Sequence, residues 1–117
     1  MENQLAIYLF VAKKSEVLLC QEFVETVKNI LSVKLFGEIS RFKDFFAWIM
    51  DLSKTRNFTL VLDEFQEFKL INPSVFSEIQ NLWDADKSES KLNLIFWGSV
   101  YSLMKDIFEN SGEPLFP

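Results

Sequence analysis

Three short, continuous apolar segments stand out along the chain, each followed by polar residues. They cover residues 5–11, 58–62 and 92–97 and are rich in Leu, Ile, Val and aromatic side chains. Uninterrupted apolar segments of this length are typical of strands that are buried on both faces of a parallel sheet. The pattern therefore predicts three buried parallel strands.

The intervening segments repeat apolar side chains at helical spacing. Helices are predicted over residues 15–32 and 40–54, from Asn72-Pro73 to about residue 83, and around residues 101–108. Expected caps are Ser15, Ser40 and Asn72, the last followed by Pro73. The polar segment 84–91 is expected to be an exposed loop, and residues 65–71 a connection with a helical turn. The buried stripe of the first helix is expected at Val17, Cys20, Val24, Val27 and Leu31, widened by Phe23 and Ile30.

This alternation predicts the fold class. The expected order is β-α-α-β-α-β-α, which implies right-handed crossovers and a parallel sheet. We expect a three-layer α/β domain with a short parallel sheet of three strands, covered on both faces by about four helices. A length of 117 residues suits one such domain.

Composition excludes several classes of function. The net charge of −5 disfavours non-specific binding to nucleic acid, because the chain repels a phosphate backbone. With one cysteine, Cys20, and no histidine, the chain cannot form an internal disulfide, a His-based zinc site or a His-dependent triad. Cys20 is expected to be a buried apolar residue rather than a reactive thiol. No apolar segment reaches the ~20 residues of a membrane helix, so we expect a soluble, cytoplasmic protein.

The main candidate site lies where the second predicted strand ends, at Asp63 and Glu64. Ligands of open α/β sheets bind outside the carboxyl ends of the strands, which is where this pair is expected. The alternative interpretation is that both acids are ordinary turn residues or helix caps. Ser99, after Gly98 at the end of the third strand, is a candidate phosphate sensor or else the cap of the last helix.

A phosphate-binding loop is missing from the sequence. Such a loop reads G-x-x-x-x-G-K-[ST], and its amides and lysine hold the phosphates. None of the glycines, Gly37, Gly98 and Gly112, begins one.

Several segments in order resemble one family. The chain resembles the predicted P-loop ATPases of archaea and bacteria in the AAA+/STAND-like group, often described as archaeal or DEXX-box ATPases. The resemblance is carried by YLFVAKKSEVLLCQEF (8–23), TLVLDEFQEF (59–68), PSVFSEIQNLWD (73–84), LNLIFWGSVYSLM (92–104) and EPLFP (113–117).

The resemblance implies roles for individual residues. Asp63 matches the Walker B acid that binds Mg²⁺, Glu64 the catalytic acid, and Ser99 the sensor. Sheets of this family run 5-1-4-3-2, so the three strands would be strands 2, 3 and 4, with residues 58–62 in the centre. An unrelated small α/β domain would not need that order.

The missing loop changes what the resemblance implies. Residues 1–117 are expected to form a partial ATPase core with only the Walker B and sensor part. Mg-ATP is the cofactor of the parent family, and none is expected to bind to this chain alone. The strand Leu92–Trp97 would lack the strand that normally pairs with its outer edge. We therefore expect a homo-oligomer, a dimer, in which two copies pair through this edge. The alternative is a non-enzymatic oligomerising or partner-binding module derived from such an ATPase.

Overall fold

The computed structural model describes residues 5–98, so the expected sensor Ser99 and the expected last helix at residues 101–108 lie outside the described residues. The elements follow one another in the order expected from the sequence. They are β1 (Leu5–Phe10), α1 (Glu16–Leu31), α2 (Phe42–Leu52), β2 (Phe58–Asp63), the short 3-10 helix η1 (Phe65–Glu67), α3 (Phe68–Ile71), α4 (Ser74–Asp86) and β3 (Leu92–Trp97).

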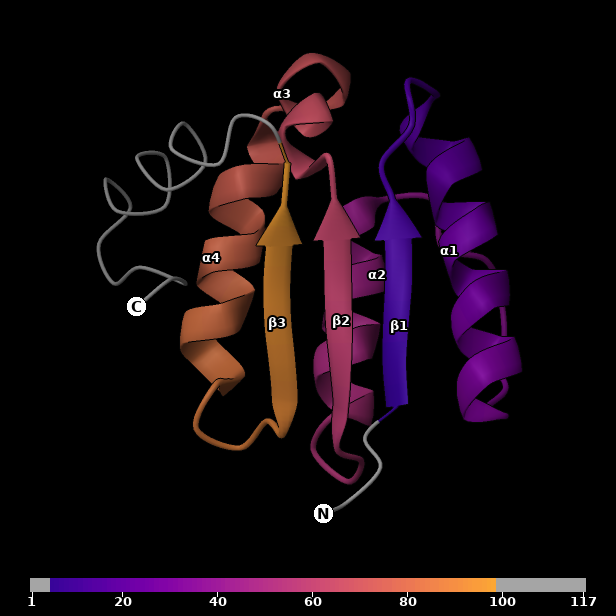
Figure 1. Cartoon of the computed structure of the whole chain (residues 1–117), viewed down its shortest axis with the longest axis vertical. Coiled ribbons are helices and arrows are strands. Elements are labelled where there is room, and N and C mark those ends of the chain that lie inside the picture. The colour runs from indigo at the N-terminus through magenta and orange to yellow at the C-terminus, as the bar shows by residue number, and fades with distance from the viewer. Residues whose placement is uncertain (1–4, 99–117) are drawn as a thin grey trace.

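The strands form one parallel sheet in the order β1-β2-β3. The register aligns Tyr8 with Val61, and Val61 with Ile95. The fold is therefore α/β, as predicted, with three parallel strands and with β2 in the centre. All three carboxyl ends meet at one edge, together with η1 and α3 (Figure 1).

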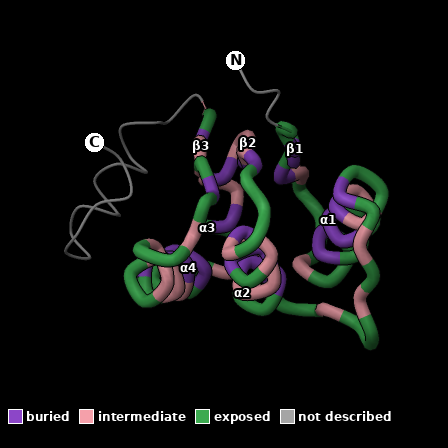
Figure 2. Tube along the Cα trace, turned by 90° about the horizontal axis from the view of Figure 1, so that it is seen from below, coloured by how far each residue is buried: buried purple, intermediate pink, exposed green. Residues whose placement is uncertain are grey.

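The long helices α1, α2 and α4 lie on the same face of the sheet (Figure 2). The handedness of the connections explains this arrangement. The crossovers from β1 to β2 and from β2 to β3 step across the sheet in the same direction, and right-handed crossovers that step the same way fall on the same face. Within residues 5–98, the helices thus cover one face, and we call the opposite one the open face.

A cluster of phenylalanine rings fills the space between the sheet and the helices. Phe42 lies at its centre, with its ring centroid 4.7 Å from that of Phe68 and 5.5 Å from that of Phe45. Its side chain is fully buried. Most of the Phe side chains among residues 5–98 are buried, but Phe10 and Phe36 are 49% and 94% exposed.

The helix starts confirm two predicted caps and correct one. Ser15 Oγ accepts a hydrogen bond from the amide of Leu18 at 3.2 Å. Asn72 Oδ1 accepts one from the amide of Ser74 at 3.2 Å, immediately before α4. The predicted cap at Ser40 was wrong, because α2 follows Arg41 and has no cap from its own segment.

Two expectations for the helices were wrong in part. In α1 most of the predicted stripe is buried, namely Cys20, Phe23, Val24, Val27 and Leu31, but Val17 and Ile30 are exposed and Leu19 is buried instead. Residues 84–86 belong to α4 rather than to a loop, and the Gln80 amide donates to Asp84 Oδ1 at 2.9 Å within this last turn. Among residues 5–98, none of the helices combines the length and apolar character that crossing a membrane requires.

Candidate functional site

The sheet itself fixes the backbone at Asp63 and Glu64. The carbonyl of Asp63 accepts a hydrogen bond from the amide of Val11 at 2.9 Å, on the β1 side. The amide of Glu64 donates to the carbonyl of Trp97 at 2.9 Å, on the β3 side. The two acids therefore lie together at the carboxyl end of the central strand, as the sequence predicted.

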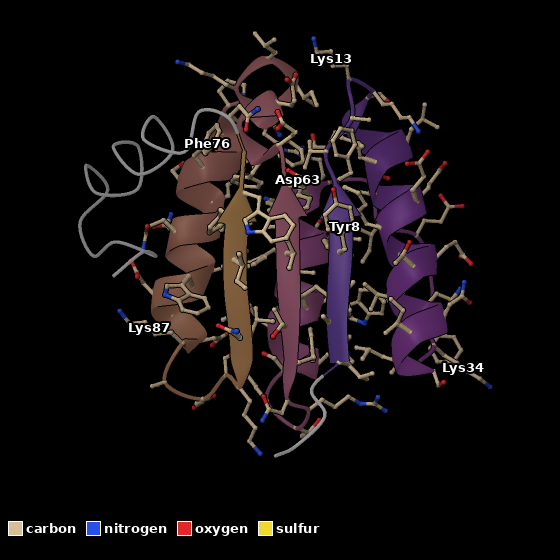
Figure 3. All side chains as sticks on the ribbon, viewed as in Figure 1. Tyr8, Lys13, Lys34, Asp63, Phe76 and Lys87 are labelled. Atoms are coloured by element: carbon tan, nitrogen blue, oxygen red, sulfur yellow. The ribbon has the colours of Figure 1, made fainter. Side chains whose placement is uncertain are left out.

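The Asp63 side chain lies on the open face and is bound by a tyrosine. Tyr8 Oη donates a hydrogen bond to Asp63 Oδ2, and the two labelled side chains point toward each other in Figure 3. The Tyr8 ring also lies 6.2 Å, centroid to centroid, from that of Trp97. The hydrogen bond to Asp63 raises the pKa of Tyr8 above 10.0, with smaller contributions from burial and from the charges of Asp63 and Glu64.

Glu64 has a backbone conformation that is uncommon outside glycine. Its φ of 57° and ψ of 39° are left-handed, which costs a residue with a Cβ roughly 1–2 kcal/mol. Non-glycine residues in this conformation are concentrated at functional sites. The conformation turns the chain away from β2 and into η1.

A glutamine and a glycine pack beside Glu64. Gln66 Nε2 donates a hydrogen bond to Glu64 Oε1, and Gln66 Oε1 is buried with no hydrogen-bond partner among residues 5–98. A Cβ on Gly98 would lie only 2.5 Å from Gln66 Oε1. A larger residue than glycine would therefore displace the Gln66 side chain.

An open groove runs along this edge of the sheet. It has a volume of about 530 Å³ and is lined by Phe10, Val11, Ala12, Lys13, Glu64 and Glu67. A second groove of about 540 Å³ adjoins it and shares Lys13 and Glu67. Lys13 is the one cation in the lining of the first groove, at the end of the molecule where the strands terminate (Figure 3).

The charges of the first groove do not favour the binding of an anion. Lys13 is opposed there by two carboxylates, and no ion pair within residues 5–98 involves it. Within the same residues, no three His, Cys, Asp or Glu side chains gather so that they could hold a metal ion. A phosphate group at this edge would need positive charge or amide donors from elsewhere.

Sequence reasoning found the acidic pair but missed its neighbours. Tyr8, Gln66 and Trp97 contact the acids or lie beside them. All three lie in segments that carry the family resemblance, but no role was predicted for any of them. Tyr8 reaches Asp63 diagonally, since Asp63 is aligned with Phe10. The register of β1 against β2 brings the tyrosine and the acid together, and this register could not be predicted from the sequence.

The single cysteine is not part of this site. Cys20 is fully buried in α1, as predicted. Burial, followed by the charges of Glu16 and Asp44, raises the pKa of its thiol from 9.0 to about 12. The thiol is therefore protonated and inert at neutral pH.

Comparison with known proteins gives one distant similarity. The chain is 36% identical over 56 residues, 48% of its own length, to "Uncharacterized protein MJ0424" of Methanocaldococcus jannaschii. The aligned region spans about half the length of that relative, at 54%. No family model matches the chain, and no solved structure matches it.

Proposed function

We propose that this chain contains the acidic-strand part of a P-loop ATPase core of the AAA+/STAND-like kind. The observation that carries the proposal is the position of Asp63-Glu64, at the carboxyl end of the central strand of three parallel strands. Strand order 2-3-4 of such a core requires that arrangement. The left-handed backbone at Glu64 adds support, since strain of this kind is concentrated at functional sites.

Each acid has a distinct role in the proposal. Asp63 would hold Mg²⁺, usually through water, and Glu64 would orient the attacking water. Bound Mg²⁺ would supply charge neutralisation for the phosphates. Tyr8 holds the Asp63 carboxylate by a hydrogen bond, so it fixes the orientation of that carboxylate and competes with any cation for one of its oxygens. Ser99 would act as the sensor.

The groove at this edge is incomplete for nucleotide binding. Its lining pairs one lysine with two carboxylates, which is unfavourable for a triphosphate. The amides and lysine of a phosphate-binding loop would have to come from outside residues 5–98. We therefore propose that this chain alone neither binds Mg-ATP tightly nor hydrolyses it.

Phosphate release and calorimetry test this proposal. We expect purified chain to show background ATP turnover and no measurable heat of binding with Mg-ATP. Asp63→Asn and Glu64→Gln should give the same background. If wild type hydrolyses ATP and both variants lose that activity, the chain carries a complete site and the proposed incompleteness is wrong.

A second candidate is a non-enzymatic module that oligomerises or binds a partner. The observation that favours it is the position of β3, which pairs with β2 alone among residues 5–98. An unprotected edge strand offers backbone donors and acceptors to a second strand. Two copies related by a twofold would pair their β3 edges antiparallel. Light scattering over a hundredfold concentration range tests this, and a monomer throughout would contradict it.

A cytoplasmic location is also part of the proposal. The free, buried thiol of Cys20 is consistent with a reducing compartment. Recovery of the tagged protein in the membrane or secreted fraction would contradict this location.

A further inference from the structure

The connection between α1 and α2, residues 32–41, carries the most exposed of the large apolar side chains within residues 5–98. Phe36 is 94% exposed, so its ring adds almost nothing to the core of this fold. A single exposed apolar residue is ordinary on a protein surface. The surroundings of Phe36 are not ordinary, because the ring adjoins a pocket and is flanked by opposite charges.

The pocket lies between α1 and the connection, and we call it the α1 pocket. The connection runs back along α1, because it starts where that helix ends and the amide of Phe42 is bonded to Glu16 at the helix start. The α1 pocket has a volume of about 280 Å³ and is lined by Gln21, Val24, Glu25, Lys28, Leu35, Gly37, Glu38 and Ile39. Its apolar part consists of Val24, Leu35 and Ile39, which belong to the core or pack against it. A cavity of roughly 150 Å³ can hold a benzene molecule, so this pocket has room for a phenyl ring.

We propose that two copies of this chain associate about a twofold axis at this connection, each inserting its Phe36 ring into the α1 pocket of the other. The occupant is a second, separate polypeptide of the same sequence. The ring and the pocket belong to one surface patch, since Leu35 and Gly37, on either side of Phe36, both line the pocket. A twofold axis brings a patch against its own copy, so both rings meet a pocket and the assembly closes as a dimer.

Gly37 leaves space for the incoming ring. Its φ of 86° lies in the left-handed region, which glycine adopts without strain. The position where a Cβ would lie faces open space, with no atom of the described residues beyond its chain neighbours within 4 Å. A second chain can therefore approach the backbone closely at the rim of the pocket.

The charges on either side of Phe36 are complementary to each other. Lys34 precedes the ring by two positions and Glu38 follows it by two, and both side chains are exposed. Neither forms an ion pair within residues 5–98. Lys34 lies on the outer side of α1 and points away from the sheet (Figure 3). A twofold axis perpendicular to this surface runs the two connections antiparallel, so Lys34 of each copy faces Glu38 of the other.

This interface is separate from the edge of β3 and from the acidic pair. The helix α1 lies beside β1, on the far side of the molecule from β3 (Figure 1). The proposal therefore goes beyond the ATPase assignment and does not depend on it. Substitutions in the connection can also be made without changing the β3 edge.

Sedimentation equilibrium of the full chain tests the proposal. We expect a monomer–dimer equilibrium whose dissociation constant rises at least about a hundredfold in Phe36→Ser, because each dimer loses two buried rings. Leu70→Ser is the matched control, since it removes an apolar side chain that is 83% exposed at the carboxyl edge of the sheet. This control should leave the dissociation constant unchanged. A native ¹⁵N spectrum of each variant shows that folding is intact.

Charge reversal tests the twofold arrangement itself. Lys34→Glu and Glu38→Lys should each weaken the dimer roughly fivefold, because each places like charges opposite one another. An equimolar mixture of these two variants should restore wild-type affinity, since every lysine at positions 34 and 38 then faces a glutamate of the other variant. The restored species should contain one copy of each variant.

Several results would overturn the proposal. A wild-type chain that is monomeric at millimolar concentration would do so. A dimer that Phe36→Ser leaves equally tight would assign association to another surface, such as the edge of β3. A mixture of the two charge variants that associates no better than either variant alone would show that the connections do not face each other antiparallel. Dilution of the wild type that leaves the amides of residues 21–28 and 34–39 unmoved would exclude the α1 pocket.

Discussion

Removing the Glu16 carboxylate should destabilise the fold more than removing any other single acid of α1. Glu16 Oε2 accepts the amide hydrogen of Phe42 at 2.7 Å, and Glu16 Oε1 accepts a hydrogen bond from Asn72 Nδ2 at 3.0 Å. One side chain therefore joins the starts of α1 and α2 to the cap of α4. The Glu16 carboxylate caps α2 in place of Ser40, the cap that the sequence predicted.

The magnitude follows from these two bonds. A hydrogen bond to a charged group contributes about 1.5–3 kcal/mol, and the favourable interaction with the dipole of α1 adds about 0.3–1 kcal/mol. Glu16 is half-buried, so we use the lower ends of these ranges. Glu16→Ala should lower the free energy of unfolding by about 3 kcal/mol. Glu16→Gln, which keeps one acceptor oxygen, should lower it by about 1 kcal/mol.

Urea unfolding followed by circular dichroism measures this effect. Glu25→Ala is the matched control, because Glu25 is an exposed acid of the same helix whose partner is Lys28 at 3.3 Å. Its effect should stay within about 0.5 kcal/mol. A double-mutant cycle with Asn72→Ala isolates the second bond. Equal destabilisation by Glu16→Ala and Glu25→Ala would show that the two Glu16 hydrogen bonds do not stabilise the fold.

Three further predictions concern Glu64, Tyr8 and Cys20. Glu64→Gly should be more stable to urea than Glu64→Ala by about 1 kcal/mol, because only glycine relieves the left-handed backbone, and a more stable alanine variant would disprove the strain. The raised pKa of Tyr8 means that the folded state holds this proton more tightly, so stability is retained below pH 10 and falls as pH rises above it. Tyr8→Phe should weaken that fall, and an absorbance titration in which Tyr8 ionises below pH 10 would contradict it. Cys20, whose pKa is about 12, should resist a disulfide reagent at pH 8 until urea unfolds the chain, and immediate reaction would show that it is accessible.

The sequence predicted those features of the fold and site that neighbouring residues encode. Unbroken apolar segments identified all three strands, and the residues after them located Asp63 and Glu64 at the correct edge. Ser15 was recognisable as a cap because its bond to Leu18 is local.

What the sequence did not predict depends on contacts between distant segments. Glu16 caps α2 across 26 positions, and Tyr8 binds Asp63 across 55 positions. Neither hydrogen bond can be recognised from the residues next to its donor or acceptor, because each depends on how separate elements lie relative to one another. The covering of only one sheet face by the helices of residues 5–98 likewise follows from the direction of the crossovers, which becomes visible only when the strand order is known.

Mn²⁺ in place of Mg²⁺ tests whether Asp63 binds a divalent cation, as we propose. Mn²⁺ broadens nearby amide resonances of the ¹⁵N-labelled chain without any need for a phosphate-binding loop. We expect millimolar Mn²⁺ to broaden the amides of Val11, Glu64 and Gly98 first, because these residues lie together at the carboxyl ends of the strands. Asp63→Asn should abolish this selectivity, and Asp51→Asn, which makes the same chemical change at an exposed position of α2, should preserve it. Broadening that is spread evenly over exposed acids, or that is unchanged in Asp63→Asn, would contradict the proposed role of Asp63.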